Sequence, residues 1–389
     1  MAQGFAPALL THLKTLMAQN YGGIKITPAG FLKALIDNNP NLDVSTIDGE
    51  RLRGLKLSTD GGHIRDVRVK YLPRITYDQV SERDDCENDV GFSYSESSIY
   101  APRFAKLGFQ LEWNLVERYE KAASDLVNMG TPDVGVLREV ETQLMHCVNG
   151  IISRINGTLL SDLTFGVNAT TGTNATKLIN INRDGSVLNL SDGVTEILSD
   201  AQQNEFVGDV ILVGNGTMNK FEIAKGSIGI NSAGLNLGSQ TGYSWYHDIN
   251  SANVPTMGAD AVAAFAKGSV GFVDIDRYIS WKSGPFGNSY FAQILLPVES
   301  GEGVVTTMPF NLQVRELDCP AEAYDGYDTR TMGRGYQVLI SKAYGLWQSP
   351  SNQFQPTDRL AGNNGSLIYK VTNNCDPCDS IVPPFADVV

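Results

Sequence analysis

Apolar residues recur with a helical period in the central part of the chain. The members of this stripe are spaced three or four positions apart: Leu137, Val140, Leu144, Cys147, Val148, Ile151, Ile155 and Leu159. The spacing predicts one amphipathic helix from Thr131 to about Leu163, with Thr131 as its N-cap and Pro132 in its first turn. Such a helix would be roughly 45 Å long and would serve as a spine on which other elements lie.

Shorter helical patterns precede the spine. Residues 5–19 and 29–37 have helical spacing, and the second pattern ends at Asn38-Asn39-Pro40. Because Pro cannot continue a helix, the second pattern stops there. Together these patterns predict an N-terminal arm over residues 1–49 rather than a domain.

The segment from Arg51 to Leu72 alternates on both sides of a turn at Asp60-Gly61-Gly62. Apolar residues occupy every second position of its flanks: Leu55 and Leu57 before the turn, and Val67, Val69 and Tyr71 after it. This pattern predicts a long β-hairpin. Its second strand also alternates polar residues, namely Asp66, Arg68 and Lys70. One face is therefore polar, and we expect the hairpin to project from the molecule, although an ordinary edge hairpin has the same pattern.

Residues 165–270 are rich in Gly, Asn, Ser and Thr, with short apolar strands between them. Six Asn-x-Ser/Thr triplets occur in the chain and are interpreted as loop composition: Asn156, Asn168, Asn174, Asn189, Asn215 and Asn364. From Phe272 onward, alternating strands return and predict a second β-rich layer.

Composition and charge narrow the function classes. A net charge of −13 makes tight DNA binding unfavourable, because DNA binding requires Lys and Arg to displace counterions, but a container that must not adhere to DNA remains possible. The first 20 residues lack a basic segment, an apolar core and a cleavage site, which predicts synthesis in the cytoplasm. No run approaches the about 20 apolar residues that span a bilayer, so no membrane association is expected. Five Cys without an export signal are expected to be reduced thiols.

Motifs for chemistry are incomplete. The stretch DVILVGNGTMNKF (209–221) places Gly214-Asn215-Gly216 after an apolar run, but a dinucleotide-binding turn needs a third glycine where Asn219 stands. Cys375 and Cys378 have Cys-x-x-Cys spacing without a second pair to complete a zinc site. Residues 81–89 carry five acids without calcium-loop spacing.

Histidine residues provide no stronger site. His146 is expected to be packed or capped within the spine helix, and His247 is not expected to form a relay with the adjacent Asp248. We therefore assign no catalytic, cofactor-binding or metal-binding residue, and expect no enzyme activity.

The order of these parts, together with several short sequence segments, resembles the HK97-type major capsid protein of tailed bacteriophages. Residues 137–160 (LREVETQLMHCVNGIISRINGTLL) look like that family's spine helix, and residues 204–216 (NEFVGDVILVGNG) look like a strand entering its axial domain. Residues 265–281 (FAKGSVGFVDIDRYISW) look like the turn that leaves that domain, and residues 336–371 look like the C-terminal sequence of phage capsid proteins.

The resemblance implies an α+β, HK97-like fold with five parts. These are an N-terminal arm (1–49), an extended loop (50–102), a peripheral domain with the spine helix (103–164), a Gly/Asn-rich axial domain (165–272), and returning peripheral strands with a tail (273–389). It also implies assembly contacts in the extended loop, through Asp60, Gly61, Gly62, Arg65, Arg68 and Lys70. The implied partners are further copies in hexamers and pentamers, a portal, scaffold or decoration proteins, and enclosed double-stranded DNA. The protein would then be part of the virion.

Two other classes remain open. A β-rich binding or tail protein is favoured by the Asn-, Gly- and Thr-rich middle, but the long central helix argues against it. An enzyme is supported only by the weak Gly-x-Gly turn and the Cys pair.

Overall fold

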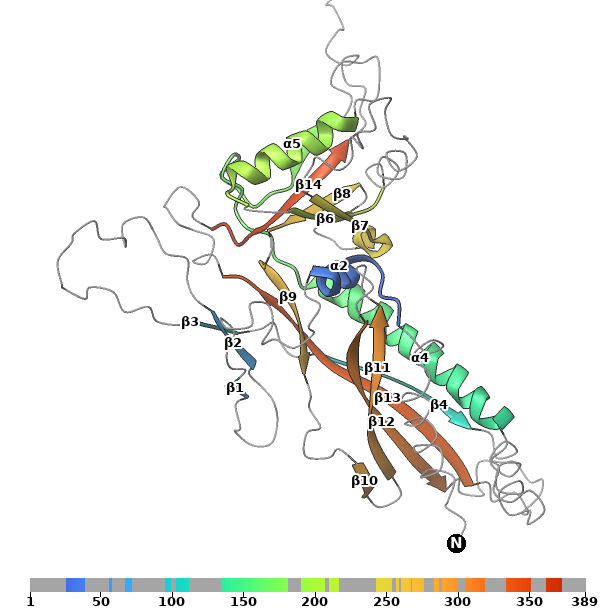
Figure 1. Cartoon of the computed structure of the whole chain (residues 1–389). Coiled ribbons are helices and arrows are strands. Elements are labelled where there is room, and N and C mark those ends of the chain that lie inside the picture. The colour runs from blue at the N-terminus through green and yellow to red at the C-terminus, as the bar shows by residue number, and fades with distance from the viewer. Residues whose placement is uncertain are drawn as a thin grey trace, which may run out of the picture.

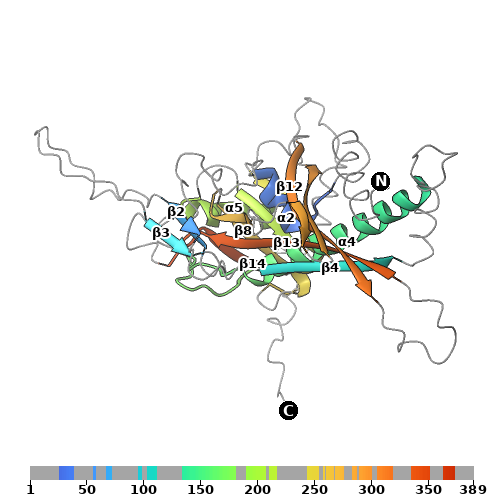
Figure 2. The same ribbon diagram turned by 90° about the horizontal axis from the view of Figure 1, so that it is seen from below.

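The computed structural model describes helices, strands and connections between residues 26 and 372, with gaps (Figures 1 and 2). The described residues are 26–38, 56–57, 67–71, 95–98, 103–111, 134–180, 190–206, 210–216, 243–253, 257–258, 260–266, 268–275, 283–286, 289–299, 305–318, 334–350 and 362–372. They form a mixed helix-and-sheet architecture, which confirms the expected combination of helices and strands.

Three sheets organise the described residues. The first contains β1 (Lys56–Leu57), β2 (Val67–Tyr71) and β3 (Ser95–Ser98). The second contains β4 (Arg103–Leu111), β9 (Val270–Ile275), β10 (Ser283–Phe286), β11 (Ser289–Glu299), β12 (Val305–Asp318) and β13 (Arg334–Gln348). The third contains β5 (Lys177–Asn180), β6 (Val210–Gly214), β7 (Tyr243–His247), β8 (Ala261–Phe265) and β14 (Ser366–Thr372). The helices are α2 (Gly30–Asn38), α4 (Val134–Ser161), α5 (Leu190–Gln203) and the 3₁₀ helix η6 (Ile249–Asn253).

The predicted spine is present as α4, a helix of 28 residues. Seven residues of the predicted stripe are buried: Val140, Leu144, Cys147, Val148, Ile151, Ile155 and Leu159. They pack against the six-stranded sheet, where α4 contacts β4 and β13. Burial of each such side chain contributes about 1.5–3 kcal/mol, which explains why the stripe and the helix coincide. Burial also raises the pKa of the Cys147 thiol.

The six-stranded sheet has the order β10-β11-β12-β13-β4, and β9 pairs with the remaining length of β13. All of these pairs are antiparallel. Alternation along β12 places four apolar side chains in the core: Met308, Phe310, Leu312 and Val314. Because side chains on a strand alternate between faces, the intervening residues of β12 face away from the core.

The five-stranded sheet has the order β5-β14-β8-β6-β7 and is covered by α5 on one face (Figure 1). β5 runs parallel to β14 and β6 parallel to β7, whereas β8 is antiparallel to both of its neighbours. β14 comes from residues predicted to belong with the returning peripheral strands, yet it lies inside this sheet. Sequence periodicity could not reveal this, because it identifies a strand without identifying its neighbours.

The short helix α2 joins the two larger sheets. It matches the pattern predicted at residues 29–37 and buries Phe31, Leu32 and Ile36. Its contacts reach α4, β6, β7 and β9. The first helical pattern of the predicted arm, residues 5–19, lies outside the described residues.

The predicted hairpin strands pair as β1 and β2, with Lys56 opposite Arg68 and Leu57 opposite Val67. β3 extends this sheet on the other side of β2. Figures 1 and 2 show the three strands to one side of the two larger sheets. Within the described ranges, no helix is both long enough and apolar enough to cross a membrane.

Candidate functional site

The Gly214-Asn215-Gly216 turn is explained by packing. β6 is buried along its whole length, and a Cβ added to Gly214 would lie 2.5 Å from the Ala261 carbonyl oxygen. Gly216 has φ +72°, and a Cβ there would lie 1.8 Å from Asp260 Oδ1. Both glycines are therefore required by the close approach of β8 and the residue before it, independently of any phosphate.

Asp248 joins three segments that are distant in sequence. One of its carboxylate oxygens, Oδ2, accepts hydrogen bonds from the Phe31 backbone N–H (2.7 Å) and from Asn156 Nδ2 (2.8 Å). The other oxygen, Oδ1, accepts from the Asn250 backbone N–H (2.8 Å). Asp248 is 2% exposed, so all three donors are satisfied inside the protein. α2, α4 and the end of β7 consequently meet at one carboxylate.

Local backbone geometry presents Asp248 to α2. Its own N–H donates to the Gly214 carbonyl oxygen (2.9 Å), which extends the β6–β7 ladder by one residue. Gly30, with φ +63°, begins α2, and a Cβ at this position would lie 2.2 Å from Asp248 Oδ2. A carboxylate at the first turn also complements the positive end of the helix dipole. His247 is exposed while the adjacent Asp248 is buried.

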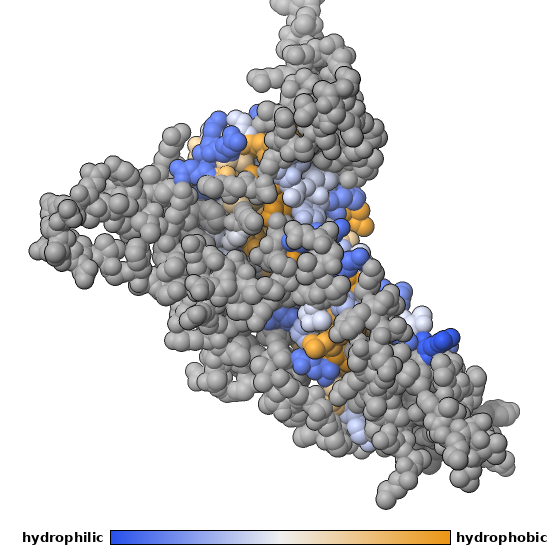
Figure 3. All heavy atoms as spheres, in the orientation of Figure 1, coloured by the Kyte–Doolittle hydropathy of each residue, from blue (hydrophilic) through white to orange (hydrophobic). Residues whose placement is uncertain are grey.

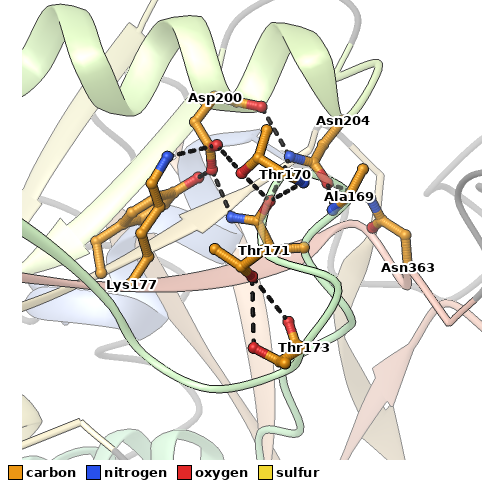
Figure 4. A network of polar contacts seen from close by, with 10 residues as sticks. Ala169, Thr170, Thr171, Thr173, Lys177, Asp200, Asn204 and Asn363 are labelled. Carbon is orange, nitrogen blue, oxygen red and sulfur yellow. Dashed lines mark hydrogen bonds and ion pairs between the residues drawn. The ribbon is translucent and has the colours of Figure 1, made fainter.

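Asp200 of α5 is the centre of a second buried network, drawn in Figure 4. Its Oδ1 accepts from Lys177 Nζ (2.8 Å) and Thr170 Oγ1 (2.5 Å), and its Oδ2 accepts from Tyr369 Oη (2.7 Å) and Asn168 Nδ2 (2.5 Å). These donors come from β5, from β14 and from the turn after α4. The carboxylate thus fastens α5 to the sheet beneath it.

The network changes the acidity of two groups. Burial raises the pKa of Asp200, but hydrogen bonds from Lys177, Thr170, Tyr369 and Asn168 together outweigh it, so its pKa lies below the usual range. The pKa of Tyr369 is raised strongly, first by burial and then by the negative charge of Asp200. Asp200 is therefore held as a carboxylate and Tyr369 as a neutral phenol.

Asparagine side chains extend this network to the C-terminal strand. Asn204 donates to Asn168 Oδ1 (3.1 Å), and its own Oδ1 accepts from the Ala169 N–H (2.8 Å) and Asn363 Nδ2 (3.1 Å). Asn363 in turn accepts from the Gly365 N–H (2.8 Å), just before β14. The interpretation of the six Asn-x-Ser/Thr triplets as loop composition is wrong for Asn156, whereas Asn168 lies in the turn after α4. Asn156 lies inside α4, and both side chains are buried and hydrogen-bonded because their partners arrive from other segments.

The six-stranded sheet contains a buried ion pair between Lys342 and Asp274. Lys342 Nζ also donates to the Pro309 carbonyl oxygen (2.6 Å) and lies 5.6 Å from the centre of the Phe310 ring. The pair ties β13 to β9 and β12. No pattern in the sequence distinguished Lys342 from a surface lysine.

Gln348 connects the two larger sheets at the end of β13. Its side chain bonds to the backbone N–H and carbonyl of Thr164 and to Ser366 Oγ. Just after the end of α4, Asp162 pairs in bidentate fashion with the exposed Arg103 of β4 (2.7 and 2.5 Å). These contacts anchor the C-terminal end of α4 between β4 and β14.

Chemically, these arrangements hold segments together. Among the residues the structure describes, no group of three or more His, Cys, Asp and Glu side chains is arranged to hold a metal ion. His146, expected to be packed, is exposed, because it lies outside the buried stripe of α4. Cys375, Cys378 and the acidic segment 81–89 lie outside the described residues.

The predicted assembly residues are only partly described. Arg68 and Lys70 lie in β2, where Arg68 is opposite Ser98 and Lys70 is opposite Glu96 of β3. Asp60, Gly61, Gly62 and Arg65 lie outside the described residues.

No family model and no curated protein matches the sequence. Among solved structures, phage capsid chains are similar to this chain over most of its length. For "Cyanophage A-1(L) capsid asymmetric unit", identity is 11%, the TM-score is 0.42, and the alignment covers 92% of this chain and 97% of that chain. For "Capsid structure of the Cyanophage P-SCSP1u", identity is 11%, the TM-score is 0.35, and the alignment covers 93% of this chain and 94% of that chain. For "The capsid of Myoviridae Phage XM1", identity is 12%, the TM-score is 0.35, and the alignment covers 81% of this chain and 89% of that chain. All three TM-scores lie below 0.5, so the function is inferred from the elements of this chain and not from these similarities.

Proposed function

We propose that this chain is the major capsid protein of a tailed phage, with the HK97 fold, and that it assembles into an icosahedral shell around double-stranded DNA. The arrangement of its elements supports this most directly. One 28-residue helix lies along a six-stranded sheet, a second sheet with its own helix is joined to it, and a small sheet stands to one side. Two larger sheets that are joined through α2, a shared apolar core and a few buried polar contacts suit a subunit whose parts each meet different neighbours.

The proposed domains follow the sequence boundaries. Residues 103–164 with the returning strands form the peripheral domain, residues 165–272 form the axial domain, and residues 50–102 form the extended loop. β14 joins the axial sheet from the C-terminal part of the chain, so the axial domain also takes in residues 366–372. β9 pairs with β13 in the six-stranded sheet, so residues 270–272 go with the peripheral strands.

The proposed partners are further copies of the chain, arranged as hexamers and pentamers in the virion. Specific interfaces are typically about 1,600 Å² in area, and a projecting loop creates such an area where a rounded subunit could not. A portal and scaffold or decoration proteins complete the particle. The net charge of −13 suits a wall that encloses DNA without adhering to it, and we propose no catalytic activity, cofactor or membrane association.

Within the extended loop, we propose that the turn at Asp60-Gly61-Gly62 and the cations Arg65, Arg68 and Lys70 contact a neighbouring copy. Acids of the segment 81–89 are candidate counter-charges. Oppositely charged surfaces on two copies would guide their approach and set their register.

Expression of the protein, alone and with the products of its neighbouring genes, tests the function. Particle mass by light scattering and negative-stain microscopy should show capsomers or closed shells. A chain that stays monomeric in both settings would contradict the proposal and favour a β-rich binding or tail protein.

Charge reversal tests the loop contacts. R68E together with K70E should abolish shells, whereas R138E together with R154E changes the same charge on the exposed side of α4 and should leave them intact. Normal shells from the first variant would refute the loop contacts while leaving the shell function standing.

A further inference from the structure

A small cavity lies where α2 meets the two larger sheets. Its volume is about 20 Å³. Its walls include Phe31 and Leu35 of α2, Ile211 of β6, Phe265 of β8 and Ser269 of the turn between β8 and β9. β8 belongs to the five-stranded sheet and β9 to the six-stranded sheet, and α2 contacts both β6 and β9 (Figure 1). The cavity is therefore part of the junction between the sheets.

The surroundings of the cavity are apolar, with one exception. Hydrophobic residues of this part of the molecule extend to the surface, as Figure 3 shows in its upper half, where the five-stranded sheet lies. Among the described residues that line the cavity, Ser269 alone has a polar side chain, and none has a charged one. Any occupant must accordingly be small and uncharged, because an ion would lose its hydration without gaining a counter-charge.

The hydroxyl of Ser269 is buried without a protein partner. Ser269 is 0% exposed, and its Oγ makes no hydrogen bond to any described residue. Two other buried side-chain atoms in the described part of the chain share this property, Asn215 Oδ1 and Trp245 Nε1, but neither residue lines the cavity. Since buried hydroxyl groups nearly always have a hydrogen-bond partner, the partner of Ser269 Oγ is sought inside the cavity that the residue lines.

The backbone of Ser269 holds the residue in place. Its N–H donates to the Ala266 carbonyl oxygen (3.0 Å), which closes a four-residue turn, and its carbonyl oxygen accepts from the Ser349 N–H (2.7 Å). Gly268, the third residue of this turn, has φ +81°, a conformation that favours glycine. Both backbone groups of Ser269 are thus satisfied, and the side chain is the group that still needs a partner.

The size of the cavity limits the occupant to a single water molecule. One water requires about 10–15 Å³ measured in this way, whereas a ring such as benzene occupies a cavity of about 150 Å³. A buried water also needs at least two polar partners. Ser269 Oγ is one, and the Ala266 carbonyl is a candidate for the other, because Ala266 lines the same cavity and a carbonyl oxygen can accept a second hydrogen bond.

We infer that this cavity is the binding site of one structural water molecule, anchored by Ser269 Oγ. The water satisfies the buried hydroxyl and fills the space between α2 and the β8–β9 turn. A bridging water of this kind is nearly as favourable as a direct hydrogen bond. The inference concerns the folded chain and does not depend on the proposed shell function.

A high-resolution density map of the full chain tests the site directly. The wild type should show a peak about 2.5–3.0 Å from Ser269 Oγ, inside the cavity. S269V replaces the hydroxyl by a methyl group and adds a second methyl, so the peak should be missing. A wild-type map without the peak, or a peak that persists in S269V, overturns the inference.

The stability of S269A gives a second test, because its sign depends on whether water is bound. If Ser269 Oγ holds a water, S269A removes that hydrogen bond, and the ratio of folded to unfolded chain in urea titrations should fall about five- to tenfold. If the hydroxyl has no partner at all, S269A removes an unfavourable buried group, and the ratio should rise.

S251A is the matched control. Ser251 is also 0% exposed, but its Oγ donates to the Asp248 carbonyl oxygen (2.8 Å), so its hydroxyl is satisfied within the protein. Both variants should therefore lose stability by a similar factor. An unchanged or raised ratio in S269A beside a fall in S251A overturns the water site, and it leaves the shell function untouched.

Discussion

Replacing Asp248 by alanine should loosen α2 from the rest of the molecule. The substitution removes the acceptor of the Phe31 N–H and of Asn156 Nδ2, and the third donor, the Asn250 N–H, loses its partner too. α2 depends on this contact because it is only nine residues long and such short helices are marginal without tertiary contacts.

The expected loss of docking free energy follows from the two donors that share Oδ2 of Asp248, the Phe31 N–H and Asn156 Nδ2. Each buried donor left without a partner costs about 1–3 kcal/mol, and loss of a carboxylate at a helix N-terminus costs about 0.3–1 kcal/mol. The effects are not additive, so about 3–4 kcal/mol is expected for α2 docking. Since about 1.4 kcal/mol corresponds to a factor of ten, amide protection in α2 should fall by roughly 100-fold or more.

Hydrogen–deuterium exchange by mass spectrometry, on peptides covering residues 30–38, measures this protection directly. D248N keeps one acceptor oxygen and should lose less protection than D248A. D162A is the matched control, because Asp162 pairs with an arginine that is 48% exposed, and such pairs contribute about 0–1 kcal/mol. If D248A leaves exchange in residues 30–38 within about threefold of wild type, the reasoning that this carboxylate holds α2 is refuted.

Three further predictions concern the other buried groups. The pKa of Asp200 is lowered on folding, so its contribution to stability is present above its unfolded pKa of about 3.9 and is lost as pH falls through the folded pKa. The stability of D200N should therefore depend less on pH below about pH 4 than that of the wild type. D200N should also be about 2–3 kcal/mol less stable at pH 7, because Lys177 loses its counter-charge. The same pH dependence in both proteins would contradict the prediction. The pKa of Tyr369 is raised, so its contribution to stability is present below pH about 10 and is lost as pH rises further. Ultraviolet titration should show fewer tyrosines ionising near pH about 10 in the folded protein than after unfolding, and Y369F should reduce this difference by one tyrosine; an unchanged difference would contradict the prediction. K342M removes the cation beside buried Asp274 and should lower the free energy of unfolding by about 3–5 kcal/mol in urea titrations, whereas K342M/D274L should lose less; additive losses would show that the two side chains are not coupled.

The sequence was sufficient where a local pattern decides the structure. The three-to-four spacing from Val140 to Leu159 predicted α4, because a helix places those positions on one face whatever that face later meets. The same reasoning predicted α2 and the pairing of β1 with β2. Alternation also identified the returning strands, but it could not order them into sheets.

Tertiary structure alone decided which strands distant in the chain are neighbours and which polar residues are buried. β14 enters the five-stranded sheet between β5 and β8, although about 190 residues separate it from β5 in the chain, and no local pattern encodes such a pairing. Asp200 and Asp248 read as ordinary polar residues in the sequence. They become buried junctions only because donors from distant segments converge on them, and a buried carboxylate is stable only when its partners arrive with it.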